Sequence, residues 1–133
     1  MATYTLRVET SLPYDAALTS TREALAAQGF GIISEIDLAA TLKAKLDVDL
    51  PPTVILGACR PQLAYEAMQK DPAIATLLPC NVSVRSTPSG TTVIEAVDPS
   101  AMMGLADGGG FDAVAADARL RLVAALAALS QES

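Results

Sequence analysis

Two cysteines are the residues of this sequence whose type and position are best suited to chemistry. Cys59 is followed by Arg60 and a proline, and Cys80 stands between a proline and Asn81. Each thiol lies at an expected junction between a strand and its neighbour, where side chains tend to be aimed at an opening rather than buried. We therefore take Cys59, Arg60, Cys80 and Asn81 as candidate ligand-binding residues, with Arg60 holding an anionic group of a small ligand.

The chemistry of the two thiols has two open interpretations. A helix is expected to start at Pro61, and its N-terminus and Arg60 would both lower the pKa of a nearby Cys59 thiol. Alternatively, Cys59 and Cys80 are small buried hydrophobic residues, as unpaired cysteines often are. The sequence does not fix whether the sulfur atoms meet. If strands 53–59 and 80–87 are parallel neighbours, the two cysteines lie at opposite ends of the sheet. If the connection 71–79 crosses back, the two cysteines come together.

Several catalytic and metal-binding chemistries are excluded by residue type. The sequence has 2 cysteines and no histidine, so a Cys-His nucleophile is absent. Two thiolates without imidazole cannot complete a four-coordinate zinc site in one subunit. The glycine-rich stretch 104–110 lacks the lysine of a phosphate-binding loop. We accordingly predict no catalytic residue, no metal and no cofactor.

Length and composition limit the class of protein. A chain of 133 residues fits one domain, 1–133. Hydrophobic residues make up 51% and charged residues 18%, with a mean hydropathy of +0.37, an apolar surplus that a homodimer interface would bury. The net charge of −6 excludes nucleic acid as a partner. Apolar runs are too short to span a membrane, and no signal sequence begins the chain, so we predict a cytoplasmic protein with reduced thiols.

The pattern of apolar residues predicts alternating strands and helices. Strand patterns occur at 4–10, 30–36, 53–58, 80–87 and 91–97. Helix patterns occur at 13–28, 38–46, 61–70, 98–103 and 111–129. The segment 73–78 is ambiguous and is compatible with a single helical turn. Asp37 and Asp98 precede helices in positions typical of N-caps.

This order of elements predicts an α/β (α+β) fold: a two-layer sandwich with a mixed five-stranded sheet and helices packed mainly on one face. In the second strand, Ile36 is expected on the core side. The other face would carry charged side chains, which are Arg7, Glu9, Glu35, Arg85 and Glu95. This face is either solvated or the dimer interface. The alanine-rich outer side of the last helix is a second candidate for the dimer interface.

The chain also resembles a known family, the domain of unknown function family 302. The resemblance covers nearly the whole chain and rests on separated segments in the same order: 24–31 (ALAAQGFG), 36–46 (IDLAATLKAKL), 57–67 (GACRPQLAYEA), 77–82 (LLPCNV) and 98–103 (DPSAMM). It implies a compact two-layer fold and a dimer, with no established activity. The family pattern has asparagine where this chain has Arg60, which cannot cap a helix in the same way.

These observations favour a non-catalytic small-ligand-binding or interaction module that forms a homodimer. The alternative is a thiol-dependent redox or sulfur-handling protein that uses Cys59 and Cys80. Met102 and Met103, beside the glycine-rich stretch, either fill the core or form an adaptable wall of a small ligand pocket.

Overall fold

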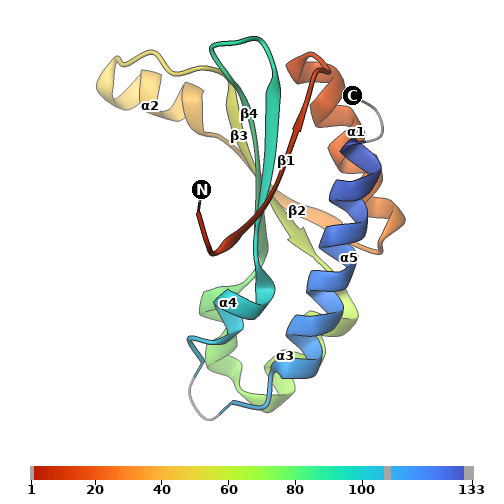
Figure 1. The fold of residues 1–133 in the computed structure, drawn as a ribbon. Coiled ribbons are helices and arrows are strands. Elements are labelled where there is room, and N and C mark those ends of the chain that lie inside the picture. The colour runs from red at the N-terminus through yellow and green to blue at the C-terminus, as the bar shows by residue number, and fades with distance from the viewer. Residues whose placement is uncertain (1, 107–108, 131–133) are drawn as a thin grey trace.

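A five-stranded sheet forms one layer of the protein in a computed structural model that describes residues 2–106 and 109–130 (Figure 1). The strands are β1 (Thr5–Thr10), β2 (Gly31–Asp37), β3 (Thr53–Cys59), β4 (Cys80–Ser86) and β5 (Thr92–Val97). Their spatial order is β1-β5-β4-β3-β2. The two-layer fold and the five strands expected from the sequence are confirmed.

The sheet is antiparallel throughout, whereas the sequence led us to expect a mixed sheet. Parallel neighbours need a connection that crosses back over the sheet. The connection between β3 and β4 instead continues beyond the end of the sheet as α3 (Pro61–Lys70) and the 3₁₀ helix η1 (Pro72–Leu77), and it re-enters at the end that it left. Because β4 therefore runs antiparallel to β3, Ala58 pairs with Cys80.

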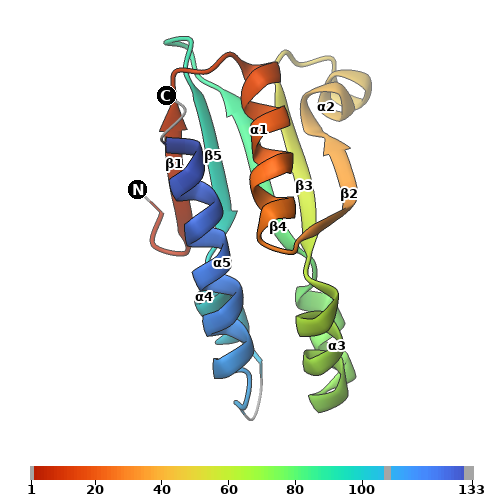
Figure 2. The same cartoon turned by 90° about the vertical axis from the view of Figure 1, so that its right-hand side faces the viewer.

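Two helices cover one face of the sheet, α1 (Tyr14–Ala27) and α5 (Asp112–Ser130), which lie side by side (Figure 2). They enclose the main cluster of buried residues together with the inward side chains of the strands. That cluster includes Ala17, Leu25, Val54, Leu56, Val82, Val84, Ile94, Leu122 and Leu129. Because inward and outward side chains alternate along each strand, one face of the sheet is apolar. The helices α1 and α5 pack on this face, so the expectation of helices mainly on one side is confirmed.

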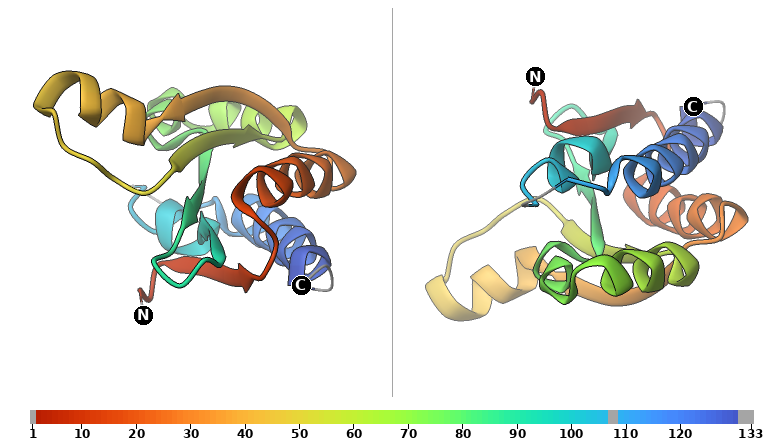
Figure 3. Two further views of the ribbon diagram at one scale, coloured as in Figure 1. Left: turned by 90° about the horizontal axis from the view of Figure 1, so that it is seen from above. Right: turned by 90° about the horizontal axis from the view of Figure 1, so that it is seen from below.

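The second strand and the helix after it depart from the expected pattern. β2 has a bulge between Ile32 and Ser34, which reverses the faces of the residues that follow. Ile36 is therefore 47% exposed rather than in the core, and Glu35 forms an ion pair with Arg22 of α1 rather than lying on the uncovered face. The helix α2 (Leu38–Leu46) has no buried residue, and it projects to the side opposite α1 and α5 (Figures 1 and 3).

A smaller cluster of buried residues lies beyond the end of the sheet. It joins α3, η1 and the first turns of α5 to α4 (Pro99–Met103) through Ala67, Ile74, Met103, Phe111, Val114 and Ala115. The expected caps Asp37 and Asp98 form, because each carboxylate accepts a hydrogen bond from a backbone amide two or three residues later. Asp71, which was not expected as a cap, does the same for η1. Of the ambiguous segment 73–78, all but Leu78 lies in η1, and Leu78 is its C-cap.

Candidate ligand-binding site

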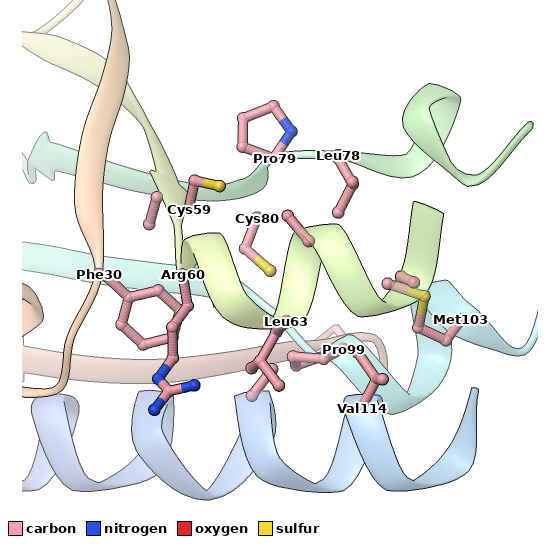
Figure 4. A pocket seen from close by; sticks show the side chains of 14 residues that line it. Phe30, Cys59, Arg60, Leu63, Leu78, Pro79, Cys80, Pro99, Met103 and Val114 are labelled. Atoms are coloured by element: carbon pink, nitrogen blue, oxygen red, sulfur yellow. The ribbon is translucent and has the colours of Figure 1, made fainter. Parts of the chain in front are cut away.

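A small pocket lies where the main cluster meets the smaller one, at the end of the sheet (Figure 4). The ends of β3 and β5 and the start of β4 reach this point, and α3, α4 and α5 close it. Its volume is about 30 Å³. The lining is mostly apolar and includes Phe30, Cys59, Arg60, Leu63, Leu78, Cys80, Met103 and Val114.

Both cysteines line this pocket, from neighbouring strands that run in opposite directions. Cys59 is the last residue of β3 and Cys80 the first of β4, one position apart in the ladder because Cys80 pairs with Ala58. Neither thiol is in a disulfide. Cys80 is buried, with 7% of its surface exposed, and Cys59 is partly exposed. The antiparallel ladder thus makes the two cysteines neighbours, which the sequence left open. Their side chains point to different sides, because Cys80 shares a face with its partner Ala58, and Figure 4 shows the Cys59 sulfur beside Pro79.

The pKa values of both thiols are shifted upward by burial. Desolvation raises the pKa of Cys59, which contradicts the lowered pKa expected at the start of α3. In the first turn of α3, the amide of Leu63 donates to the Arg60 carbonyl over 3.0 Å rather than to this sulfur. Burial also raises the pKa of Cys80 to about 11, with a smaller contribution from the neighbouring Cys59. Both thiols are therefore protonated at neutral pH.

Arg60 packs along α5 rather than standing free beside the thiols. Its Nη1 lies 3.7 Å from Asp117 Oδ2, and Arg121 shares this carboxylate through its Nε at 3.2 Å. Arg60 Nε is buried, and it is the one buried side-chain polar atom of the described residues without a hydrogen-bond partner. Gly29 makes room for it, since a Cβ there would lie 3.2 Å from Nε. Arg60 also makes no side-chain cap for α3, as expected.

Asn81 does not belong to this pocket. Successive side chains of a strand point to opposite faces, so Cys80 faces the helices and Asn81 the other side of the sheet. There Asn81 lines an open groove of about 440 Å³ with Thr5, Ile55 and Glu95. Of the four predicted residues, Cys59, Arg60 and Cys80 therefore line the pocket, and Asn81 does not.

One residue near the site, Asp117, had no sequence signal that connects it with the site. Asp117 precedes Arg121 by one helical turn, which indicates a pair on α5, but nothing in the sequence connects it with Arg60. Met103 was weighed both as a core residue and as a pocket wall, and it is both: it is 7% exposed and lines the pocket. Among the described residues, no three His, Cys, Asp or Glu side chains gather into a metal-binding group.

Fold and site together define a class of protein: a two-layer sandwich with an antiparallel sheet whose end, closed by helices, holds a sulfur-lined apolar pocket. In the part of the chain that the structure describes, none of the helices combines the length and apolar character needed to cross a bilayer.

Comparison with known proteins gives the family. The sequence profile described as "Domain of unknown function DUF302" matches residues 4–129, and the chain belongs to this family. It is also similar to a solved structure, the uncharacterized conserved protein DUF302 from Bacillus stearothermophilus, with 28% sequence identity and a TM-score of 0.86. The match covers 95% of this chain and 98% of that one. Among curated proteins, no match was found.

Proposed function

We propose that this protein is a non-catalytic module that binds a small ligand at the pocket between Cys59, Arg60 and Cys80 and acts as a homodimer. The observation that carries the proposal is that these three residues, from β3, the start of α3 and β4, line one pocket. Protonated thiols are poor nucleophiles, so the raised pKa values of both cysteines favour binding over catalysis.

The unpartnered Nε of Arg60 supports a ligand with a polar or anionic group. A buried donor without a partner loses its hydration without compensation, at a cost of about 1–3 kcal/mol, and an acceptor atom of a ligand would recover part of it. Asp117 neutralises the arginine only in part, because the carboxylate is 3.7 Å away and is shared with Arg121.

This proposal is tested by titrating acetate and phosphate into isotope-labelled protein and following backbone amide signals. We expect shifts confined to residues around the pocket, and their loss in Arg60→Gln. The matched control is Arg119→Gln, because Arg119 does not line the pocket and its ion pair is with Asp98. Signals that stay unchanged in the native protein, or shift equally in both variants, would contradict the proposal.

For the homodimer, the edge of β1 is the surface best suited to a second copy. β1 pairs with β5 without interruption and carries no proline, lysine or bulge, the devices that usually protect an edge strand. The other edge strand, β2, is bulged. Beside β1 lies an apolar groove of about 370 Å³ that includes Val8, Val123 and Leu126.

The charges of β1 match those of a second β1. If two copies pair antiparallel around Val8, Arg7 lies opposite the partner's Glu9 on the same face, and opposite charges across strands are stabilising. Within one chain these two side chains already form an exposed ion pair of 3.2 Å, which is worth little by itself. The pairing would extend the sheet to ten strands and cover the groove.

Sedimentation equilibrium distinguishes this interface from the uncovered face of the sheet. Val123 on α5 is 40% exposed and Leu46 on α2 is 65% exposed. We expect Val123→Lys to shift the protein to monomers and Leu46→Lys to leave the dimer intact. The reverse result would place the interface on the side of α2, and a native protein that is monomeric at high micromolar concentration would end the homodimer proposal.

The second candidate function, thiol-dependent redox or sulfur chemistry, is favoured by one observation: both thiols line the same pocket. It requires a reactive thiolate under the reducing cytoplasmic conditions that we predict from the sequence. Alkylation rates measured against pH test it directly. A thiol that titrates below about 8.5 would support the redox candidate, and two thiols that titrate above it would exclude it.

A further inference from the structure

We propose that the open groove on the uncovered face of the sheet is a second ligand-binding site, which takes a small organic cation: a primary ammonium group attached to a short apolar group. The groove holds about 440 Å³, within the roughly 300–1,000 Å³ of sites that bind small organic molecules. It lies on the side of the sheet away from α1 and α5 (Figure 3). Of the described residues, none lines both this groove and the pocket of the proposed function.

The lining of the open groove combines apolar side chains with a few polar ones. Ser83 pairs with Glu95 across two strands, and Ile55 pairs with Ser83 on the other side. Side chains at such positions have Cβ atoms about 4.5–5.5 Å apart, so one ligand can reach all three. In the described part of the chain, Glu95 is the one charged side chain of this lining, which also includes Tyr4, Thr5 and Asn81.

Glu95 supplies a fixed negative charge to the groove. Its side chain is only 15% exposed, and burial disfavours the charged form. Two hydrogen bonds outweigh burial and lower the pKa of Glu95: Thr5 donates to Oε2 over 2.5 Å and Arg85 donates to Oε1 over 2.9 Å. Each carboxylate oxygen can accept more than one hydrogen bond. The carboxylate is therefore ionised, held in place and able to accept a further donor.

The two arginines near Glu95 do not line the groove. Arg85 lies two residues after Ser83 on β4. An ion pair of 3.2 Å directs Arg7 to Glu9, two residues further along β1. Because β1 and β4 are both antiparallel to β5, they run in the same direction, so both guanidinium groups lie on the side of Glu95 away from the groove. A cation in the groove would be closer to the carboxylate than to either arginine, and the nearer charge dominates.

The hydroxyl groups of the groove present acceptors to a ligand. The Thr5 hydroxyl donates its proton to the Glu95 carboxylate, and the Ser83 hydroxyl donates to the Glu95 backbone carbonyl over 3.4 Å. A hydroxyl has one proton, so the lone pairs that remain can only accept. Asn81, exposed on the same face, adds a carboxamide oxygen. A primary ammonium group, with three donors and a positive charge, matches these acceptors, whereas the Glu95 charge repels an anion.

The apolar side chains of the groove favour an organic cation over a metal ion. Tyr4 is 61% exposed and offers an aromatic ring, which attracts cations as well as apolar groups, and Ile55 adds an aliphatic contact. Calcium takes about 6–8 oxygen ligands, whereas the described residues contain no group of three His, Cys, Asp or Glu side chains that could hold a metal. The net charge of −6 adds a general attraction for cations.

The test titrates three probes with the same aromatic ring into the isotope-labelled native protein at neutral pH: benzylamine, benzyl alcohol and benzoate. Backbone amide signals and the Asn81 side-chain amide signal give the place of binding and the Kd. We expect benzylamine to shift signals around the groove and to bind about 10-fold more tightly than benzyl alcohol, because hydrogen bonds between charged groups are stronger than neutral ones. Benzoate should not bind. Absence of benzylamine binding, equal affinity for benzylamine and benzyl alcohol, or shifts spread over the whole acidic surface would overturn the inference.

Two variants separate the groove from general attraction to an acidic protein. Glu95→Gln should weaken benzylamine binding by about 10-fold and leave benzyl alcohol binding nearly unchanged. Glu9→Gln is the matched control, because Glu9 is also paired with an arginine, its loss changes the net charge equally, and it does not line the groove. It should bind benzylamine like the native protein, and equal losses in both variants would contradict the site. The comparison of probes uses the native protein, so the inference remains testable if Glu95→Gln fails to fold.

Discussion

Gly57 is the position where a single methyl group should disturb both the stability of the sheet and the pocket. It lies in β3, two residues before Cys59. A Cβ built on Gly57 would lie 2.1 Å from Ser34 Oγ and 2.8 Å from Pro79 Cγ. The serine can rotate away, but the proline ring cannot. Pro79 directly precedes Cys80, so its displacement would be transmitted to the buried thiol.

The expected cost of Gly57→Ala follows from this crowding. Forcing an extra methyl group into a packed position costs about 1–3 kcal/mol, and the loss of glycine's flexibility in the unfolded chain returns about 0.4–1 kcal/mol. We expect the free energy of unfolding to fall by about 1–2 kcal/mol. Gly31→Ala in β2 is the matched control, because its Cβ would lie 3.8 Å from the Cys59 carbonyl oxygen, an ordinary contact.

Urea unfolding followed by circular dichroism, at one protein concentration for all variants, measures the difference. Gly31→Ala should be neutral or slightly stabilising. The double variant Ser34→Ala/Gly57→Ala should keep most of the loss, because the proline contact remains. Equal stability of Gly57→Ala and Gly31→Ala would refute the reasoning, and full rescue by the double variant would show that Ser34, not Pro79, is the rigid neighbour.

Three further predictions concern other parts of the fold. Because burial raises the pKa of Cys80 from 9.0 to about 11, the unfolded chain loses this proton first. The free energy of unfolding should therefore fall between about pH 9 and 11, by roughly 2–3 kcal/mol at most from this group. The fall should be clearly smaller in Cys80→Ala, in which Cys59 keeps its own raised pKa. Asp37→Ala should destabilise α2 by about 1 kcal/mol and reduce its protection in amide hydrogen exchange, whereas Asp37→Asn should retain the cap. Ile74→Ala should cost about 2–5 kcal/mol in urea unfolding because this side chain is 2% exposed, and a negligible cost would contradict its place in the smaller cluster.

Local sequence patterns were sufficient to predict most helices and strands, because capping residues and prolines mark where many of these elements begin. Asp37, Asp71 and Asp98 cap the elements that follow them, and proline stands at the start of α3, η1 and α4. The bulge in β2 has no such signal. It depends on the fit between β2 and β3, where Gly57 accommodates Ser34, and it reverses the side of the sheet to which Ile36 points.

The pocket shows which part of a site a single sequence can predict. Cys80 and Asn81 are consecutive residues at the start of a strand, so alternation alone would have placed them on opposite faces. The adjacency of Cys59 and Cys80 is different, because it depends on the direction of β4 relative to β3. A connection that crossed the sheet would have made the strands parallel and separated the thiols. That choice is made by α3 and η1, which bury Ala67 and Ile74 against α4 and α5 beyond the sheet, and this distant packing brings the two sulfur-bearing residues into one pocket.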